Sequence, residues 1–230
     1  DEIQQELRLR GLYNPPSFVT GNGFDPDEIQ LADFDPAARL ELKTPVDAKV
    51  IIFTGSLQLW QGIDRLLPAI SKFKDVYLWV IGGGDEQAIL QKRAEQHHIS
   101  ARIRWVDWLS NQQLNRYMKA SDLAVGPLAL DRKRMEEAQP MKVRSYLGAG
   151  LPLLYGYYDT KIPDGLPWAQ KVDATSLDSI IRGIQTLLLL PARSTIFRQE
   201  IRDYALRTLS WDAMASDTLG FIQHCLKIPG

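Results

Sequence analysis

The sequence has little of what marks several specialised classes of protein. Its 230 residues include one cysteine, Cys225, so no disulfide can form within the chain, which fits a reducing compartment. No apolar run approaches the roughly 20 residues of a membrane span, because Arg182 and Gln185 interrupt the longest candidate. The net charge of −1 gives no general attraction to nucleic acid or to an anionic membrane. Hydrophobic residues make up 45% of the chain, which indicates a soluble globular protein with a real core.

Short motifs of several enzyme classes are also missing. The sequence has no G-x-S-x-G nucleophile motif, no Walker lysine and no zinc-type spacing of ligands. His97 and His98 have no acid or cysteine at ligand spacing, so we expect them to sit at a helix end and not on a metal. We expect Cys225 to be a buried packing residue. A nicotinamide-dependent enzyme is disfavoured, because no strand–GxGxxG unit is followed by a ribose-binding acid at the usual distance.

Strands and helices alternate through the middle of the chain. Such alternation implies parallel strands joined by right-handed crossovers, and doubly wound sheets of this kind bind ligands at the carboxyl ends of their strands. We therefore predict an α/β, Rossmann-like, three-layer parallel sheet with a helical C-terminal tail. The predicted strands are 48–55, 76–84, 101–109, 122–128, 152–158 and 168–172, and the predicted helices are 60–73, 85–98, 110–121, 140–149, 176–190, 193–209 and 210–226.

The first forty-odd residues differ from the rest. We expect a short amphipathic helix at 1–12 and a stiff Pro-Pro connector at 13–17. We expect a small strand with an Asn-Gly turn at 18–29 and a loop at 33–47. We predict three parts: 1–16 as a linker or remnant of a preceding domain, 17–208 as the Rossmann-like domain, and 209–230 as a C-terminal helix.

The most organised stretch, 136–156, contains a helix with clear ends. Pro140 suits the first helical position, and Gly150 suits the position after the last. The first-turn amides lack intrahelical acceptors and Gln139 is a poor cap, so this end predicts an anion receptor. Lys142 adds a full positive charge to it. The alternative is an ordinary packing helix whose lysine is solvated.

Five further residues are candidates for binding a ligand. Glu137 can be an acceptor for a sugar hydroxyl, a helix-dipole partner, or the end of a solvated loop. Gly55 and Gly82 permit close approach of the backbone to phosphate, although tight turns explain them equally well. Ser56 can donate a hydrogen bond to phosphate. Trp108 can hold a nucleotide base at the edge of the sheet, or it can fill the core or a hinge surface.

Several segments together carry a family resemblance. In their order and spacing they resemble the carboxy-terminal half of family-4-like retaining glycosyltransferases with the GT-B fold, over nearly the whole chain. In that family the amino-terminal domain binds the acceptor, and the carboxy-terminal domain binds the nucleotide-sugar donor. The segments are "VTGNGFDPD", "FTGSLQLWQGIDRLLPAI", "LWVIGGGDEQAIL", "IRWVDWLSNQQLNRYMKASDLAVGPL", "EAQPMKVRSYLGAGLP" and "LSWDAMA".

The resemblance implies roles for the residues around the helix at Pro140. It places Glu137 against the donor sugar, as the first acid of a Glu-x7-Glu pattern. It places the amides of Met141, Lys142 and Val143 near the donor phosphates. We expect Lys142 and these amides to stabilise the departing nucleoside diphosphate, and Glu137 to position the sugar.

The same resemblance puts the nucleotide base at the backbone of Trp108 and Leu109. The chain departs from the family pattern at the second acid, which is replaced by Ser145. Many family members also carry an arginine and a lysine near the positions of Ser56 and Gln61. Serine can still hydrogen-bond a ribose hydroxyl, but without the help of a charge.

The expected function follows from these observations. We expect a glycosyltransferase donor-binding domain, of hexosyltransferase and retaining type, that acts on a glycan or lipid-linked acceptor in polysaccharide biosynthesis. Its partner would be an N-terminal acceptor-binding domain, which the chain is too short to include. We expect no metal, no cofactor and no nucleic-acid partner, and a cytoplasmic location at or near the inner membrane face. The alternative is a non-catalytic, degenerate nucleotide-binding or scaffolding module, which the replacements at Ser145 and Gln61 favour.

Overall fold

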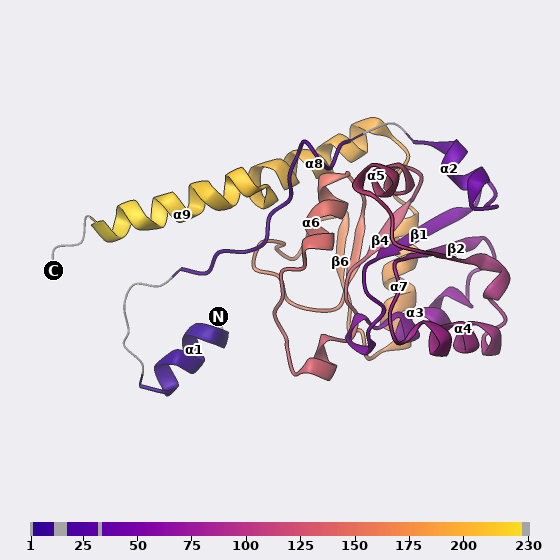
Figure 1. Cartoon of the computed structure of the whole chain (residues 1–230), viewed down its shortest axis with the longest axis horizontal. Coiled ribbons are helices and arrows are strands. Elements are labelled where there is room, and N and C mark those ends of the chain that lie inside the picture. Colours follow the sequence, from indigo (N-terminus) through magenta and orange to yellow (C-terminus); the bar gives the residue numbers. More distant parts are fainter. Residues whose placement is uncertain (1, 12–17, 32–33, 227–230) are drawn as a thin grey trace.

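Six parallel strands form one sheet in the order β3-β2-β1-β4-β5-β6 (Figure 1). The structure is a computed structural model, and it describes residues 2–11, 18–31 and 34–226. The predicted α/β fold class is confirmed, with strand positions close to those expected. The strands are β1 (Lys49–Thr54), β2 (Val76–Ile81), β3 (Ile103–Val106), β4 (Leu123–Val125), β5 (Leu153–Tyr155) and β6 (Ala169–Lys171).

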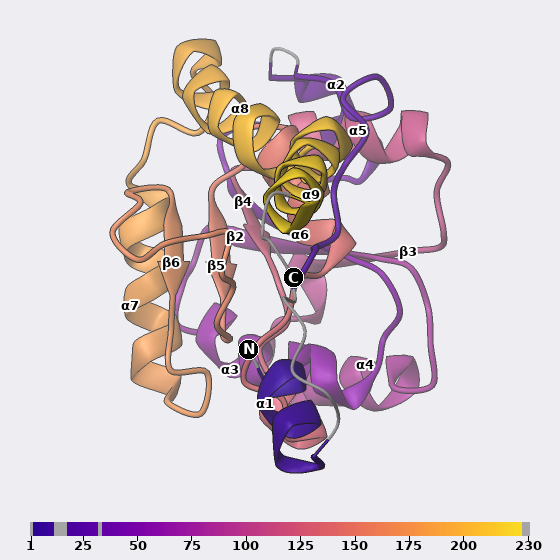
Figure 2. The same cartoon turned by 90° about the vertical axis from the view of Figure 1, so that its left-hand side faces the viewer.

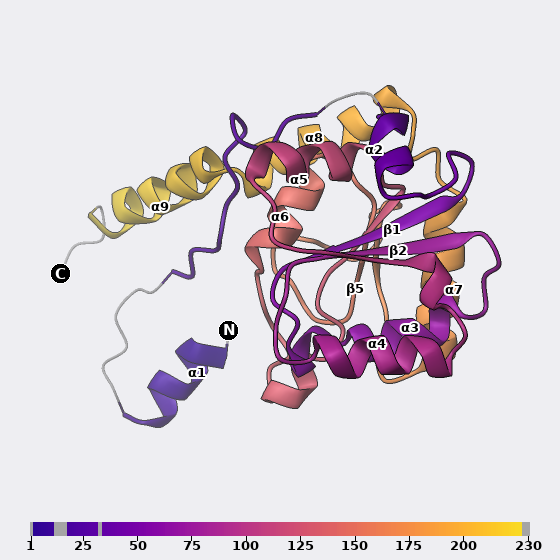
Figure 3. The ribbon, with the colours of Figure 1, turned by 45° about the vertical axis from the view of Figure 1, so that its right-hand side comes forward.

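Helices cover both faces of the sheet (Figures 2 and 3). One face packs against α3, α4 and α7, and the other packs against α2, α5, α6 and α8. The helices are α1 (Glu2–Leu9), α2 (Pro36–Glu41), α3 (Ile63–Ile70), α4 (Gln87–Gln96), α5 (Asn111–Lys119), α6 (Met141–Gly148), α7 (Leu177–Leu188), α8 (Thr195–Leu209) and α9 (Trp211–Leu226), with 3-10 turns η1 (Leu59–Gln61), η2 (Ser100–Arg102) and η3 (Leu130–Lys133).

Strand β1 lies at the centre of both hydrophobic cores. Val50 and Ile52 point into the core on the α6 side, whereas Ile51 and Phe53 point into the core on the α3 side. All four side chains are fully buried, as expected for a parallel strand covered by helices on both faces. Burying such a side chain contributes about 1.5–3 kcal/mol, so this strand fixes the sheet and the position of the turn that follows it.

The strand order reverses between β1 and β4. From β1 the chain continues to β2 on one side, and from β4 it continues to β5 on the other side. The turns that leave β1 and β4 therefore diverge at the carboxyl edge of the sheet, which is where doubly wound sheets bind ligands. Gly55 and Gly126 are the first residues after these two strands.

The expectation of a loop at 33–47 is wrong, because α2 occupies part of it. The Asp35 side chain caps this helix by accepting a hydrogen bond of 2.9 Å from the amide of Ala37. Pro36 fits the first helical position, where no amide proton is needed. Ala38 and Arg39 are buried, so tertiary packing stabilises a helix too short to be stable alone.

The expected small strand at 18–29 is also absent. A single parallel bridge joins Phe24 to Ser210, and the turn in this segment lies at 26–28 and not at the predicted Asn22–Gly23. The amide of Phe24 donates to the carbonyl of Leu209, and the amide of Trp211 donates back to the carbonyl of Phe24. The predicted connector at 13–17 lies outside the described residues.

The last helix, α9, projects beyond the sheet (Figure 1). Leu219 and Ile222 are exposed on it, and Phe221 stacks on Phe18 with ring centroids 5.3 Å apart. Cys225 is only half-buried there, so the prediction of a buried packing cysteine is wrong: the helix has left the body of the sheet. Among the described residues, no helix combines the length and apolar character that crossing a bilayer needs.

Candidate functional site

Two glycine turns meet at the carboxyl edge of the sheet. Gly55 follows β1 with φ 123° and Gly82 follows β2 with φ 118°, a region that side chains disfavour. A Cβ atom on Gly82 would lie 2.3 Å from the carbonyl oxygen of Gly55, so the two turns pack backbone against backbone. Glycine at both positions leaves the ends of β1 and β2 without side chains of their own.

The amino end of α6 lies open at the same edge. Pro140 is the N-cap, with an extended ψ of 135°, and Met141 is the first helical residue, one later than predicted. The amides of Val143 and Arg144 both donate hydrogen bonds to the carbonyl of Pro140. The amides of Met141 and Lys142 have no acceptor among the described residues. A helix end with such unpaired amides attracts an anion.

A buried ion pair anchors this end of α6. The guanidinium of Arg144 binds both carboxylate oxygens of Asp159, at 2.5 and 3.0 Å, and both side chains are fully buried. Arg144 also donates to the carbonyl of Asn22 and to the side-chain oxygen of Gln139. The Gln139 side chain is therefore turned toward Arg144 and does not cap the helix amides.

The ammonium of Lys142 is part-buried beside the first glycine turn. Its Nζ donates to the side-chain oxygen of Gln61 at 2.8 Å and sits 4.0 Å from the ring centroid of Phe53. A Cβ atom on Gly55 would come within 2.9 Å of it. No carboxylate among the described residues pairs with this lysine. Removal from water lowers its pKa from 10.5 to about 7, since burial disfavours the charged form.

Two buried tyrosines lie at this part of the fold: Tyr146 on α6 itself, and Tyr157 in the loop after β5. The hydroxyl of Tyr146 accepts a hydrogen bond of 2.7 Å from the amide of Thr54 and lies 3.0 Å from its side-chain oxygen. This contact ties α6 to the last residue of β1. The hydroxyl of Tyr157 is buried and has no partner among the described residues; a Cβ atom on Gly126 would lie 3.5 Å from it. Burial raises the pKa of both phenols.

Three other predicted residues lie just before α6, on α6 and in the turn after β1, respectively. Glu137 is half-buried and forms a parallel bridge with Tyr158, and its carboxylate has no hydrogen bond to another described residue. The hydroxyl of Ser145 donates to the carbonyl of Met141 at 3.3 Å, so it is turned onto its own helix. Ser56 is half-buried, and its hydroxyl has no bond to another residue that the structure describes.

The predicted base-binding residues follow β3. Trp108 is 66% exposed, and its indole nitrogen lies near Gly83, where a Cβ atom would be 3.7 Å away. Leu109 is half-buried and packs against the core on the α6 side. The structure thus brings Trp108 to the turn that follows β2, at the same edge as the turn that follows β1.

The structure joins some of the predicted residues and leaves others apart. Lys142 lies against the Gly55 turn, and that turn packs on Gly82, whereas no hydrogen bond or ion pair joins Glu137 to this group among the described residues. Gln61 and Phe53, which hold the ammonium, were not predicted to do so. The sequence marks Gln61 only as a departure from the family pattern, and it marks Phe53 only as part of a buried strand.

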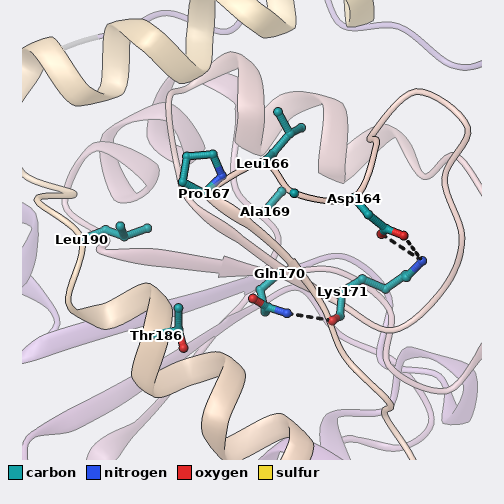
Figure 4. Close-up of a pocket in the computed structure, with 9 residues that line it drawn as sticks. Asp164, Leu166, Pro167, Ala169, Gln170, Lys171, Thr186 and Leu190 are labelled. Carbon is teal, nitrogen blue, oxygen red and sulfur yellow. Dashed lines mark hydrogen bonds and ion pairs between the residues drawn. The ribbon is translucent and has the colours of Figure 1, made fainter.

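A separate pocket of about 630 Å³ lies along the edge strand β6 (Figure 4). Its charged residues, Asp164 and Lys171, pair with each other at 3.0 Å. Strands β4 and β5 separate this pocket from β1, so it is not part of the site around Lys142. In the part of the chain that the structure describes, no group of three His, Cys, Asp or Glu side chains is arranged to hold a metal ion.

Sequence comparisons identify relatives of the chain. The family model described as "Glycosyl transferases group 1" matches residues 35–204. The lipopolysaccharide core biosynthesis glycosyltransferase LpsD of Rhizobium meliloti is 32% identical over 76 residues, which are 33% of this chain and 22% of that protein. The D-inositol 3-phosphate glycosyltransferase of Mycobacterium bovis is 31% identical over 132 residues, which are 55% of this chain and 27% of that protein. The chain therefore matches about a quarter of the length of these curated relatives.

Solved structures share the fold at low sequence identity. Sucrose-phosphate synthase from Thermosynechococcus elongatus matches with a TM-score of 0.75 and 17% identity, over 97% of this chain and 57% of that one. Anabaena Alr3699/HepE, solved in complex with UDP and glucose, matches with a TM-score of 0.74 and 15% identity, over 96% of this chain and 60% of that one. With the family model covering most of its length, the chain belongs to the group 1 glycosyl transferases and has the carboxy-terminal-domain type of the GT-B fold.

Proposed function

We propose that this chain binds the nucleotide-sugar donor of a glycosyltransferase, which transfers the sugar to a glycan or lipid-linked acceptor in polysaccharide biosynthesis. One observation carries the proposal: the part-buried ammonium of Lys142 lies beside the Gly55 turn with no carboxylate partner among the described residues. Partial removal of a cation from water without a counterion is unfavourable, and an anionic ligand would offset that cost. The structural relative solved with UDP and glucose makes a nucleoside diphosphate the natural choice of anion.

The proposed chemistry is electrostatic. The unpaired amides of Met141 and Lys142 and the Lys142 ammonium would face the two phosphates and stabilise the charge that develops as the nucleoside diphosphate leaves. Glu137 would hold a hydroxyl of the sugar, and the backbone at Trp108 and Leu109 would hold the base. We further propose hexosyl transfer with retention of configuration, by likeness to the family.

Transfer needs both reactants to be held together, so the donor site is half of an active site. We propose that an acceptor-binding domain faces the carboxyl edge of this sheet in the working enzyme. We also propose a cytoplasmic location, peripheral to the inner face of the membrane. Curated relatives whose names place them in lipopolysaccharide core biosynthesis support this setting.

A second candidate function is a non-catalytic module that binds nucleotide weakly. It is favoured by Ser145, whose hydroxyl is turned onto the carbonyl of Met141 and so offers a ribose no charged acceptor. Such a module would pair with a separate acceptor-domain chain.

A thermal-shift panel of UDP, GDP and ADP, alone and with their common sugars, separates the two candidates. A donor-binding domain should be stabilised by one base and further by its sugar; a ligand at 100 times its Kd adds about 2.7 kcal/mol. Lys142→Met should abolish the response. Lys133→Met is the matched control, because Lys133 also lies over an aromatic ring, that of Trp60, but on the exposed turn η3. A flat response to every nucleotide would reject the donor-binding proposal.

A further inference from the structure

Two polar side chains converge on the turn that follows β2. A Cβ atom on Gly83 would lie 3.6 Å from the carboxamide oxygen of Gln87 and 3.7 Å from the indole nitrogen of Trp108. Gln87 begins α4 and Trp108 follows β3, so two separate elements bring these atoms to one point at the carboxyl edge of the sheet. Gly83 is half-buried and adds no side chain of its own, so another molecule can reach this point.

The polar groups of both side chains are available to a ligand. In the ranges that the structure describes, neither the Gln87 carboxamide nor the Trp108 indole N–H takes part in a hydrogen bond to the protein. Trp108 is 66% exposed, so its ring is accessible for stacking. Nucleotide bases stack on aromatic side chains, and hydrogen bonds to their edges distinguish one base from another. Gln87 and Trp108 together offer both kinds of contact.

The two side chains differ in the hydrogen bonds that they can make. An indole N–H only donates, whereas a carboxamide accepts at its oxygen and donates at its nitrogen. The oxygen of Gln87 is the carboxamide atom nearer to the Gly83 point, and the nitrogen is farther away. A base edge that runs from the indole across this oxygen to the nitrogen therefore meets a donor, an acceptor and a second donor.

We propose that the donor is a uridine diphosphate sugar and that Gln87 and Trp108 recognise its uracil. This inference rests on the proposed function and names the base, which that function leaves open. Uracil presents an acceptor, a donor and an acceptor along one edge, through O2, N3–H and O4, and so complements all three protein groups. Guanine sets a donor against one of the protein donors, and adenine sets a C–H there. Each of these bases leaves a polar group of the site unpaired, which lowers its affinity.

Calorimetry with UDP, GDP, ADP and inorganic pyrophosphate tests this assignment. The wild type should bind UDP about tenfold more tightly than GDP or ADP. Gln87→Leu removes both polar groups of the carboxamide, and Trp108→Phe keeps an aromatic ring but removes the N–H. Each variant should bind UDP about tenfold more weakly and lose most of the preference for uracil. Pyrophosphate has no base, so its affinity should not change.

Gln91→Leu is the matched control, because it makes the same change one turn further along α4 at another half-buried glutamine, and it should leave every affinity unchanged. Equal or tighter binding of GDP or ADP by the wild type would overturn this inference and leave the donor-binding proposal intact. So would a UDP affinity that neither Gln87→Leu nor Trp108→Phe lowers, or an equal loss of pyrophosphate affinity in both variants. Binding of none of the three nucleotides would reject both proposals.

Discussion

The carboxylate of Asp159 and the guanidinium of Arg144 form a two-point ion pair in which neither side chain is exposed to solvent. Arg144 lies on α6, and Asp159 lies on the loop that follows β5, so the pair joins the helix that presents Lys142 to the neighbouring strand. Arg144 also reaches the carbonyl of Asn22. The ion pair thus holds three separate segments together behind the open amino end of α6.

Removing one member of this pair should destabilise the protein strongly. Asp159→Ala leaves the Arg144 guanidinium buried without its counterion, which typically costs about 3–5 kcal/mol of unfolding free energy. Urea unfolding followed by circular dichroism measures this loss. Asp164→Ala is the control: it breaks an ion pair whose side chains are 36% and 71% exposed, and should cost at most about 1 kcal/mol. Equal losses of unfolding free energy in the two variants would show that burial does not determine how much the Arg144–Asp159 pair stabilises the protein.

The lowered pKa of Lys142 predicts how stability changes with pH. The pKa of about 7 in the folded state lies below the value of about 10.4 in the unfolded chain, so between these pH values the unfolded state binds more protons. The unfolding free energy should therefore rise with pH across this window, by at most about 1.4 kcal/mol per unit. Below pH 7 this contribution is constant. Lys142→Met should lack the rise, and urea titrations of both proteins at pH 6, 7.5 and 9 give the comparison.

Local signals made much of the fold predictable from the sequence. Each end of α6 has its own signal: Pro140 stands at its start, and Gly150 lies just past its end with φ 77°. Strands β1 and β2 are easily recognised in the sequence as continuous apolar runs, because both faces of the sheet are covered by helices. The short helix α2 was not predicted, because its stability comes from packing. Asp35 and Pro36 are nevertheless typical of a helix start.

The internal arrangement of the site was less accessible from the sequence. The bond between Lys142 and Gln61 joins residues 81 positions apart, and no periodic pattern reports such a contact. The sequence indicates only that Asp159 lies in a loop, and its contact with Arg144 is seen only in the fold. The prediction that α6 offers unpaired amides rested on local chemistry alone, since Gln139 cannot cap them well. Side-chain contacts between residues far apart in the chain were therefore not predicted from the sequence.

Removing the hydroxyl of Tyr146, on α6, or of Tyr157, after β5, should have opposite effects on stability. Tyr157→Phe deletes a buried hydroxyl that has no described partner, so stability should stay equal or rise. Tyr146→Phe removes the acceptor for the buried amide of Thr54, and should cost about 1–3 kcal/mol. Thermal unfolding of the two variants tests this difference in sign. A clear loss of stability in Tyr157→Phe would mean that its hydroxyl has a partner, such as a buried water.

The packing of Gly82 on Gly55 should affect both stability and binding. In Gly82→Ala the new methyl group would lie 2.3 Å from the Gly55 carbonyl oxygen, so the turn beside the Lys142 ammonium must move. Gly165→Ala is the matched control, because Gly165 also has a positive φ, 92°, but has open space where its Cβ would be. The control should show only the strain of a left-handed backbone, about 1–2 kcal/mol, with unchanged nucleotide affinity. Gly82→Ala should be less stable than the control and should bind the nucleotide at least tenfold more weakly in calorimetry, because a displaced turn separates the phosphate site from Lys142. If the two variants bound the nucleotide equally well, the close packing of these turns would be a feature of the fold alone.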